Sequence, residues 1–146
     1  MRGFTLIETT VVLALMLMLA GLGATLSFAF LSTQRLAAAA ETVAAEIAQA
    51  RSDAFTQTDD QAHGVAVFTD HVVRFAGTTY ATRVPSKDVT TDLPGPVTLS
   101  GLTEIVFPSG SLRPVMDGTF TLKDGDQSYF IHVSPYGVVE WEKGTE

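Results

Sequence analysis

The chain has 146 residues, a formal net charge of −7 at neutral pH and no cysteine. This length suffices for one modest domain and one extended element. The acidic balance argues against a general nucleic-acid binder, which needs a basic surface, and the lack of thiols excludes disulfides and thiolate metal sites. Hydrophobic residues make up 46% of the chain and charged residues only 17%. The few charged residues are unevenly distributed along the sequence.

The first third of the chain is predicted to form one helix that passes through two kinds of surroundings. Between Glu8 and Arg35 no residue is ionisable, and no proline interrupts the sequence. A helix rises about 1.5 Å per residue, so this stretch is long enough to cross the roughly 30 Å hydrocarbon core of a bilayer. We therefore expect residues 4–34 to form the transmembrane half of the helix.

The second half of this helix, residues 35–56, is expected to be amphipathic. One face carries apolar side chains at steps of three and four residues, namely Leu36, Ala40, Val43, Ile47, Ala50 and Ala54. Glu41, Gln49 and Asp53 fall on the other side of the helix. Alanine is the best intrinsic helix former, and the polar run TQTDDQAHG ends the helix. The apolar stripe predicts that this half packs on a soluble domain.

Glu8 distinguishes between three interpretations of the apolar stretch. A cleaved secretory signal peptide has a shorter apolar core and no acid at this place. A simple membrane anchor leaves Glu8 unexplained, because a carboxylate at the edge of a membrane span is costly without a partner. If the chain were cut between Gly3 and Phe4, a new α-ammonium would appear four residues before Glu8. The carboxylate could then pair with the N-terminus of a neighbouring chain in a low-dielectric helix bundle.

The first residues read MRGFTLIETTVVLALM: a short basic leader that ends in glycine, then FTLIE, then an apolar run. This sequence resembles the class III signal of type IV pilins and pseudopilins. The resemblance implies a prepilin leader peptide of residues 1–3, cleavage after Gly3 and N-methylation of Phe4. It also implies that residues 4–34 serve assembly as well as membrane anchoring, with an assembly role for Glu8. It implies four kinds of partner: other pilin or pseudopilin subunits, a prepilin peptidase, the inner-membrane assembly platform and membrane lipid.

The same resemblance implies a place in the cell and a function. The chain is expected to cross the inner (cytoplasmic) membrane once, with its C-terminal domain on the periplasmic, extracytoplasmic side, or to lie within an extracellular pilus or a periplasmic pseudopilus. It would be a structural subunit of a type IV pilus or a type II secretion pseudopilus. Many major pilins have a proline in the apolar helix, where this chain has only Gly21 and Gly23 as helix weakeners. Close helix packing and local melting during extraction into a filament both remain open as their role.

Residues 57–146 are predicted to form a small antiparallel β domain, because short β-rich runs alternate with turn residues. The expected strands are 64–68, 72–75, 78–84, 97–101, 102–107, 119–123, 128–134 and 137–142, with long polar loops at 85–96 and 108–118. The first three strands are predicted to form an antiparallel meander, and the last three a second three-strand run. Together with the helix they predict an α+β fold, a long helix packed on a small antiparallel sheet as in type IV pilins.

Three further segments resemble the GspH/FimT-type minor pilins and pseudopilins: ETVAAEIAQARSDAF, FPSGSLRPV and FIHVSPYGVVEW. In some members of that group a basic stretch after the last glycine binds DNA. Here Glu140 and Glu142 stand where cations would be needed. These glutamates disfavour nucleic acid as a partner. A DNA-binding minor pilin of a competence or DNA-uptake pilus is kept as the alternative function.

No arrangement of residues in the sequence predicts catalysis. Asp117-Gly and Asp124-Gly-Asp126 are typical of tight turns, whereas calcium needs six to eight oxygen ligands. The three histidines are too widely spaced in the sequence to indicate a metal site, and no nucleophile elbow or phosphate loop is present. We therefore expect no enzymatic activity, no catalytic residue, no metal and no cofactor. The chemistry of the chain is expected to be that of a substrate, cleaved after Gly3 and methylated at Phe4.

Overall fold

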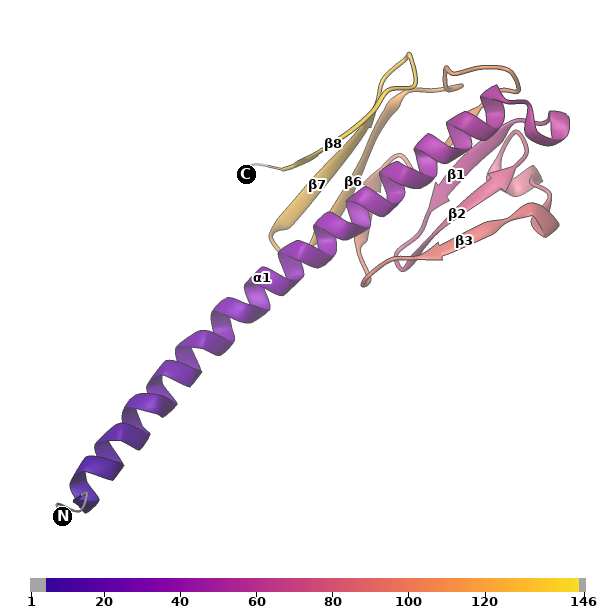
Figure 1. The fold of residues 1–146 in the computed structure, drawn as a ribbon. Helices are drawn as coiled ribbons and strands as arrows, with labels where there is room; N and C mark the ends of the chain where they lie inside the picture. Colours follow the sequence, from indigo (N-terminus) through magenta and orange to yellow (C-terminus); the bar gives the residue numbers. More distant parts are fainter. Residues whose placement is uncertain (1–4, 145–146) are drawn as a thin grey trace. The chain divides into compact units, whose positions relative to one another are not determined.

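The computed structural model describes residues 5–144, except for the side chains of residues 22–30. The chain divides into an N-terminal unit, Met1–Gln34, and a C-terminal unit, Arg35–Glu146. Helix α1, Leu6–Phe55, contributes to both units (Figure 1). Its end lies one residue before the predicted end, and it continues through both glycines that could have weakened it. The predicted first helical residue, Phe4, lies outside the described residues.

The C-terminal unit has an α+β fold, which confirms the predicted class. Its eight strands form two four-stranded antiparallel sheets, where the sequence led us to expect one. The first sheet has the order β3 (Val89–Asp92), β2 (His71–Ala76), β1 (His63–Val67), β5 (Glu104–Phe107). The second has the order β4 (Thr98–Gly101), β6 (Gly118–Asp124), β7 (Gln127–Val133), β8 (Val139–Lys143). The predicted run of the last three strands is confirmed as β6, β7 and β8.

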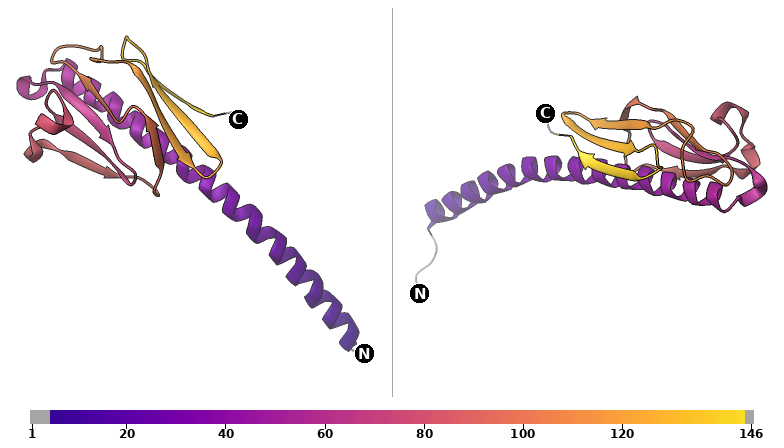
Figure 2. Two further views of the ribbon diagram at one scale, coloured as in Figure 1. Left: turned by 180° about the vertical axis from the view of Figure 1, so that it is seen from behind. Right: turned by 90° about the horizontal axis from the view of Figure 1, so that it is seen from above.

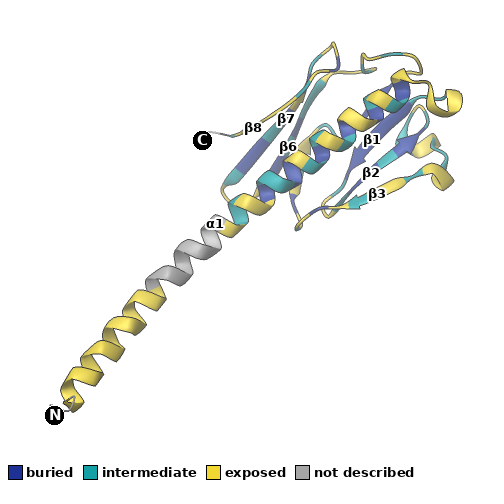
Figure 3. Cartoon of the chain, in the orientation of Figure 1, coloured by how far each residue is buried: buried dark blue, intermediate teal, exposed yellow. Residues whose placement is uncertain are grey.

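The part of α1 in the C-terminal unit lies along one face of both sheets (Figures 1 and 2). All six residues of the predicted apolar stripe are at most 1% exposed, which confirms the stripe. They share one core with side chains from both sheets, including Val65, Phe107, Phe120, Leu122 and Ile131. Strand residues that face the helix are buried, as Figure 3 shows. A stripe rich in alanine lets the sheets approach the helix closely, because it adds little side-chain volume between them.

One polar residue of the helix does not behave as predicted. Asp53 was expected to face away from the domain, but its carboxylate accepts a hydrogen bond from Nη1 of Arg74 on β2. Nε of Arg74 donates to Oε2 of Glu46, which lies about two helical turns before Asp53 on the same face, at 3.0 Å. Oε1 of Glu46 accepts from Oγ1 of Thr91 on β3 at 2.8 Å. These side chains are only about one-fifth exposed or less, and the charge-assisted bonds tie the helix to the first sheet.

The predicted strand at 78–84 is wrong. The segment instead forms a 3-10 helix, η2, at Tyr80–Thr82. Oγ1 of Thr79 accepts a hydrogen bond from the backbone N–H of Thr82 at 3.2 Å and so caps the turn. The backbone N–H of Tyr80 donates to Oε2 of Glu104 on β5 at 3.1 Å. Both bonds hold the backbone in a turn, where a strand would need its N–H groups for a neighbour.

The tyrosine of this turn covers the outer face of the first sheet. The ring of Tyr80 lies 5.2 Å from that of Phe68 and 5.6 Å from that of Phe75, between ring centroids. The guanidinium of Arg83 lies 3.8 Å from the centroid of the Tyr80 ring, and its Nε donates to Asp88 at 2.7 Å. The hydrogen bond to Asp88 raises the pKa of Arg83, so the stacked group stays charged. Every residue of β1 is consequently buried.

The predicted loop at 85–96 contains regular structure as well. It begins with a 3-10 helix, η3 (Pro85–Lys87), and continues as β3, which pairs antiparallel with β2 from His71↔Asp92 to Arg74↔Val89. The side chains of β3 are mostly exposed. An exposed edge strand needs no alternating apolar residues, so the sequence carried no strand pattern here. The other predicted strands are confirmed within about two residues at each end.

Candidate functional site

Of the three residues predicted to serve processing and assembly, the structure places only Glu8. Gly3 and Phe4 lie outside the described residues. Glu8 is exposed and lies in the first turn of α1. An acidic side chain is favourable at this end of a helix, where the backbone N–H groups give the dipole its positive end.

The other polar groups of this turn are satisfied locally. Oγ1 of Thr5 accepts a hydrogen bond from the backbone N–H of Glu8 at 3.3 Å. The hydroxyls of Thr9 and Thr10 each donate to the backbone carbonyl three residues earlier, both at 2.9 Å. Within the described part of the chain, no residue binds the carboxylate of Glu8. Among the side-chain polar groups described in this turn, it is the one without a hydrogen-bond partner.

Large apolar side chains surround α1 next to Glu8. We give the name apolar segment to the large apolar residues on either side of Glu8 in the sequence, which are between 46% and 82% exposed (Figure 3): Leu6, Ile7, Val11, Val12, Leu13, Leu15, Met16, Leu17, Met18 and Leu19. Successive helical residues point about 100° apart, so consecutive apolar positions cover all sides of the helix. A helix that is apolar all round is normally covered by protein or by lipid.

The membrane-spanning helix predicted over residues 4–34 is not found among the described residues, where no helix is long and apolar enough to cross a bilayer.

We also compared the chain with known proteins. No family model, curated protein or solved structure matches it.

The histidines of the C-terminal unit lie apart and have separate roles. His63 is buried on β1, and its Nε2 donates to the backbone carbonyl of Thr58 at 2.8 Å. Nδ1 of His71 lies 2.6 Å from the carboxylate of its neighbour Asp70. His132 pairs through Nδ1 with Oγ1 of Thr119 across β6 and β7 at 3.1 Å. Among the described residues, no three His, Asp or Glu side chains come close enough to hold a metal ion.

The Asp-Gly-Asp sequence forms the turn that its composition predicts. Asp124 pairs with Gln127, so Gly125 and Asp126 make a two-residue hairpin loop between β6 and β7. Gly125 has φ of 58°, in the left-handed region that such loops need. The backbone geometry alone accounts for this glycine.

The strand pairing places the two glutamates noted in the sequence beside His132. His132 lies opposite Glu140, and Phe130 lies opposite Glu142, on the β7–β8 pair. His132, Glu140, Trp141 and Glu142 line a depression of about 380 Å³. Glu140 and Glu142 are both exposed. Negative charge here repels phosphate, which is the main attraction in nucleic-acid binding.

Proposed function

We propose that this chain is a structural subunit, a minor pilin or pseudopilin, of a type IV pilus or a type II secretion pseudopilus. The observation that carries the proposal is the apolar segment, exposed on all sides of α1, next to Glu8, whose carboxylate has no partner among the described residues. The α+β architecture of the C-terminal unit is consistent with the proposal. The lack of any ionisable residue between Glu8 and Arg35 supports it from the sequence.

In this proposal the chain is first a substrate and then a building block. A prepilin peptidase removes residues 1–3 and the new N-terminus at Phe4 is methylated. The apolar helix stays in the inner membrane, with the C-terminal unit on the periplasmic side, until the assembly platform moves the subunit into the filament. There the apolar segment leaves lipid for the helices of neighbouring subunits. Both environments, the lipid and the bundle of neighbouring helices, are apolar, so the transfer does not expose the segment to water.

Glu8 gives this packing its register. The carboxylate pairs with the Phe4 ammonium of an adjacent subunit, so two charges that would each be costly in an apolar bundle neutralise one another. A charge pair of this kind also selects one axial position among many similar apolar contacts. The fact that Glu8 has no partner among the described residues of its own chain is what supports an intermolecular role.

Photo-crosslinking in cells tests the proposed assembly through the apolar segment. A benzoylphenylalanine at Leu13, which is 61% exposed, is expected to give adducts with other pilin-type subunits after irradiation. The matched control places the same group at Lys123, exposed on β6 of the C-terminal unit. The control is expected to give far fewer of these adducts. Adducts of Leu13 with lipid alone, or with proteins unrelated to pilins, would argue against the proposal.

A further inference from the structure

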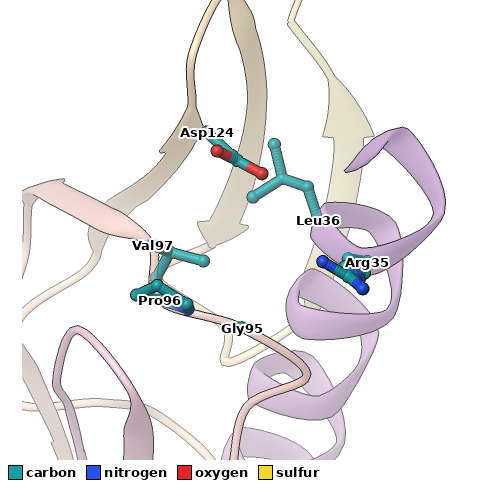
Figure 4. Close-up of a pocket in the computed structure, with 6 residues that line it drawn as sticks. All are labelled: Arg35, Leu36, Gly95, Pro96, Val97 and Asp124. Carbon is teal, nitrogen blue, oxygen red and sulfur yellow. The ribbon is translucent and has the colours of Figure 1, made fainter. Parts of the chain in front are cut away.

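The C-terminal unit contains a pocket of about 210 Å³ beside the first residues of its helix (Figure 4). Arg35 and Leu36 of α1 line one side, and Asp124 at the end of β6 lines another. The connection between β3 and β4 supplies the facing wall with Gly95, Pro96 and Val97. A water molecule occupies about 30 Å³ of liquid, so the pocket has room for a group of several heavy atoms.

The two charged side chains of the pocket have opposite signs, and each is unpaired among the residues that the structure describes. Arg35 and Asp124 are both exposed. Neither takes part in an ion pair or a side-chain hydrogen bond with any described residue. Two other arginines of this unit are held in ion pairs: Arg74 binds Glu46 and Asp53, and Arg83 binds Asp88. The pocket therefore offers one free guanidinium and one free carboxylate.

The rest of the pocket is apolar and preorganised. Leu36 is 1% exposed and Val97 is 4% exposed, so both are fixed in the core. The backbone N–H of Val97 donates to the carbonyl of Thr69 at 2.7 Å, which holds the wall in place. Gly95 has no side chain, and an added Cβ would meet no atom within 4 Å. Open space therefore lies against the backbone of Gly95, where a ligand can approach.

We propose that this pocket binds a phosphate ester that carries a primary ammonium, the chemistry of phosphoethanolamine. The guanidinium of Arg35 suits the phosphate, because its N–H groups form charge-assisted bonds with phosphate oxygens. The carboxylate of Asp124 suits the ammonium, and Leu36 and Val97 suit the short carbon chain between them. A purely anionic ligand would meet Asp124 and a chain of net charge −7, and a simple cation would leave Arg35 unmatched.

Two sources supply this chemistry: a phosphatidylethanolamine headgroup and a free phosphoethanolamine ester. The choice of the lipid headgroup as the ligand rests on the proposed function. One feature of the sequence favours the lipid. Arg35 is the first ionisable residue after the uncharged stretch that follows Glu8. If that stretch lies in the membrane, Arg35 is at the level where headgroups begin.

Titration of the full-length chain in detergent micelles with soluble O-phosphoethanolamine tests the pocket without a bilayer. Saturable shifts of the amide resonances of Gly95 and Val97 are expected, with weaker binding of inorganic phosphate and of ethanolamine. Arg35→Gln is expected to weaken binding roughly tenfold or more, since a charge-assisted bond is lost. Asp124→Asn should remove the preference for the ester over inorganic phosphate. Gly95→Val, which fills the open space, should abolish binding.

The matched controls are Arg113→Gln and Asp117→Asn, which change the same kinds of exposed side chain outside the pocket. Both should bind like the unchanged chain. The proposal is overturned if the soluble ester does not bind saturably, if phosphate binds equally well, or if the two pocket variants behave like their controls.

A second experiment decides whether the ligand is the phosphatidylethanolamine headgroup or the free phosphoethanolamine ester. The full-length chain is placed in nanodiscs that contain phosphatidylethanolamine, phosphatidylglycerol and phosphatidylcholine in equal parts, and native mass spectrometry measures the lipids that stay bound. Preferential retention of phosphatidylethanolamine, lost in Arg35→Gln, identifies the lipid. Binding of the soluble ester without lipid preference identifies the free ester. The titration in micelles does not depend on pilin assembly, so a failure of the proposed function leaves its result unchanged.

Discussion

Replacement of Ile47 by aspartate is expected to unfold the C-terminal unit. Ile47 is fully buried on the apolar stripe, in the core that α1 shares with both sheets. The change forfeits about 1.5–3 kcal/mol of apolar burial. It also places an unpaired carboxylate in the core, which costs several kcal/mol more. A small domain has only about 5–15 kcal/mol of net stability, so most or all of it is lost.

Thermal unfolding of a fragment of residues 35–146, followed by circular dichroism, measures this effect. The fragment itself is expected to unfold cooperatively as a monomer, because its contacts form a compact unit without the apolar segment. Ala48→Asp is the matched control: it adds the same charge at the next, exposed position of the helix. It should shift the melting temperature by only a few degrees. An Ile47→Asp fragment that melts like the unchanged one would show that the stripe does not carry the core.

Glu8→Ala is expected to abolish assembly while leaving processing, membrane association and folding intact. Removal of a carboxylate beside an apolar helix can only ease its insertion into lipid. The C-terminal unit has its own core and should not respond. The neighbouring Phe4 ammonium, however, would lose its partner in the filament. A buried pair broken in this way costs about 3–5 kcal/mol, enough to reduce incorporation a hundredfold or more at about 1.4 kcal/mol per factor of ten.

Co-purification of pilin-type subunits with a tagged chain measures the proposed incorporation. Glu41→Ala provides the control, since Glu41 is an exposed glutamate of the same helix in the C-terminal unit. It should recover partner subunits at the unchanged level. Recovery of partners by Glu8→Ala at that level would remove the pairing role, and a simple anchor with a tolerated glutamate would then be the better account.

Patterns that repeat along the chain predicted much of the fold. The stripe from Leu36 to Ala54 follows the helical period, and each of its members is buried because one face of the helix meets both sheets. The hairpin of β6 and β7 was readable because Gly125 and Asp126 form a two-residue loop between alternating strands. Local sequence and tertiary structure agree in these places.

The segment 78–84 shows where such patterns fail. TTYATRV has the composition of a strand, but contacts distant in the sequence decide its conformation. Tyr80 packs on Phe75 and its backbone binds Glu104, so the chain turns to cover the outer face of the first sheet. No property of the segment alone indicates these partners.

The division into two sheets was also hidden. Strands β4 and β5 are separated by only two residues, yet β4 pairs with β6 and β5 pairs with β1. Gly101, with φ of 82°, bends the chain between them. Leu102 then donates its N–H to Thr119 of the second sheet, while the carbonyl of Thr103 accepts from Val67 of the first. Two neighbouring residues therefore bond to different sheets, which only the pairing reveals.

The two candidate sites also differ in how far the sequence alone predicts them. Glu8 stands out in the sequence, because it is the last ionisable residue before a long uncharged stretch. The pocket of Arg35 and Asp124 does not, because these residues are far apart in the chain and meet only after β6 folds beside α1. The sequence showed Arg35 as the end of the apolar stretch and Asp124 as part of a turn. Their common pocket depends on the tertiary structure.

The intact mass of the chain extracted from membranes tests the central claim most directly. The account predicts loss of Met1–Gly3 alone, with an N-terminus at Phe4 that carries one added methyl group. Under the proposed processing, Gly3→Leu places a bulky side chain before the cleaved bond and should leave the full-length chain. A chain that still begins at Met1 in cells with an active prepilin peptidase, or one that has lost the whole apolar segment, would contradict the account.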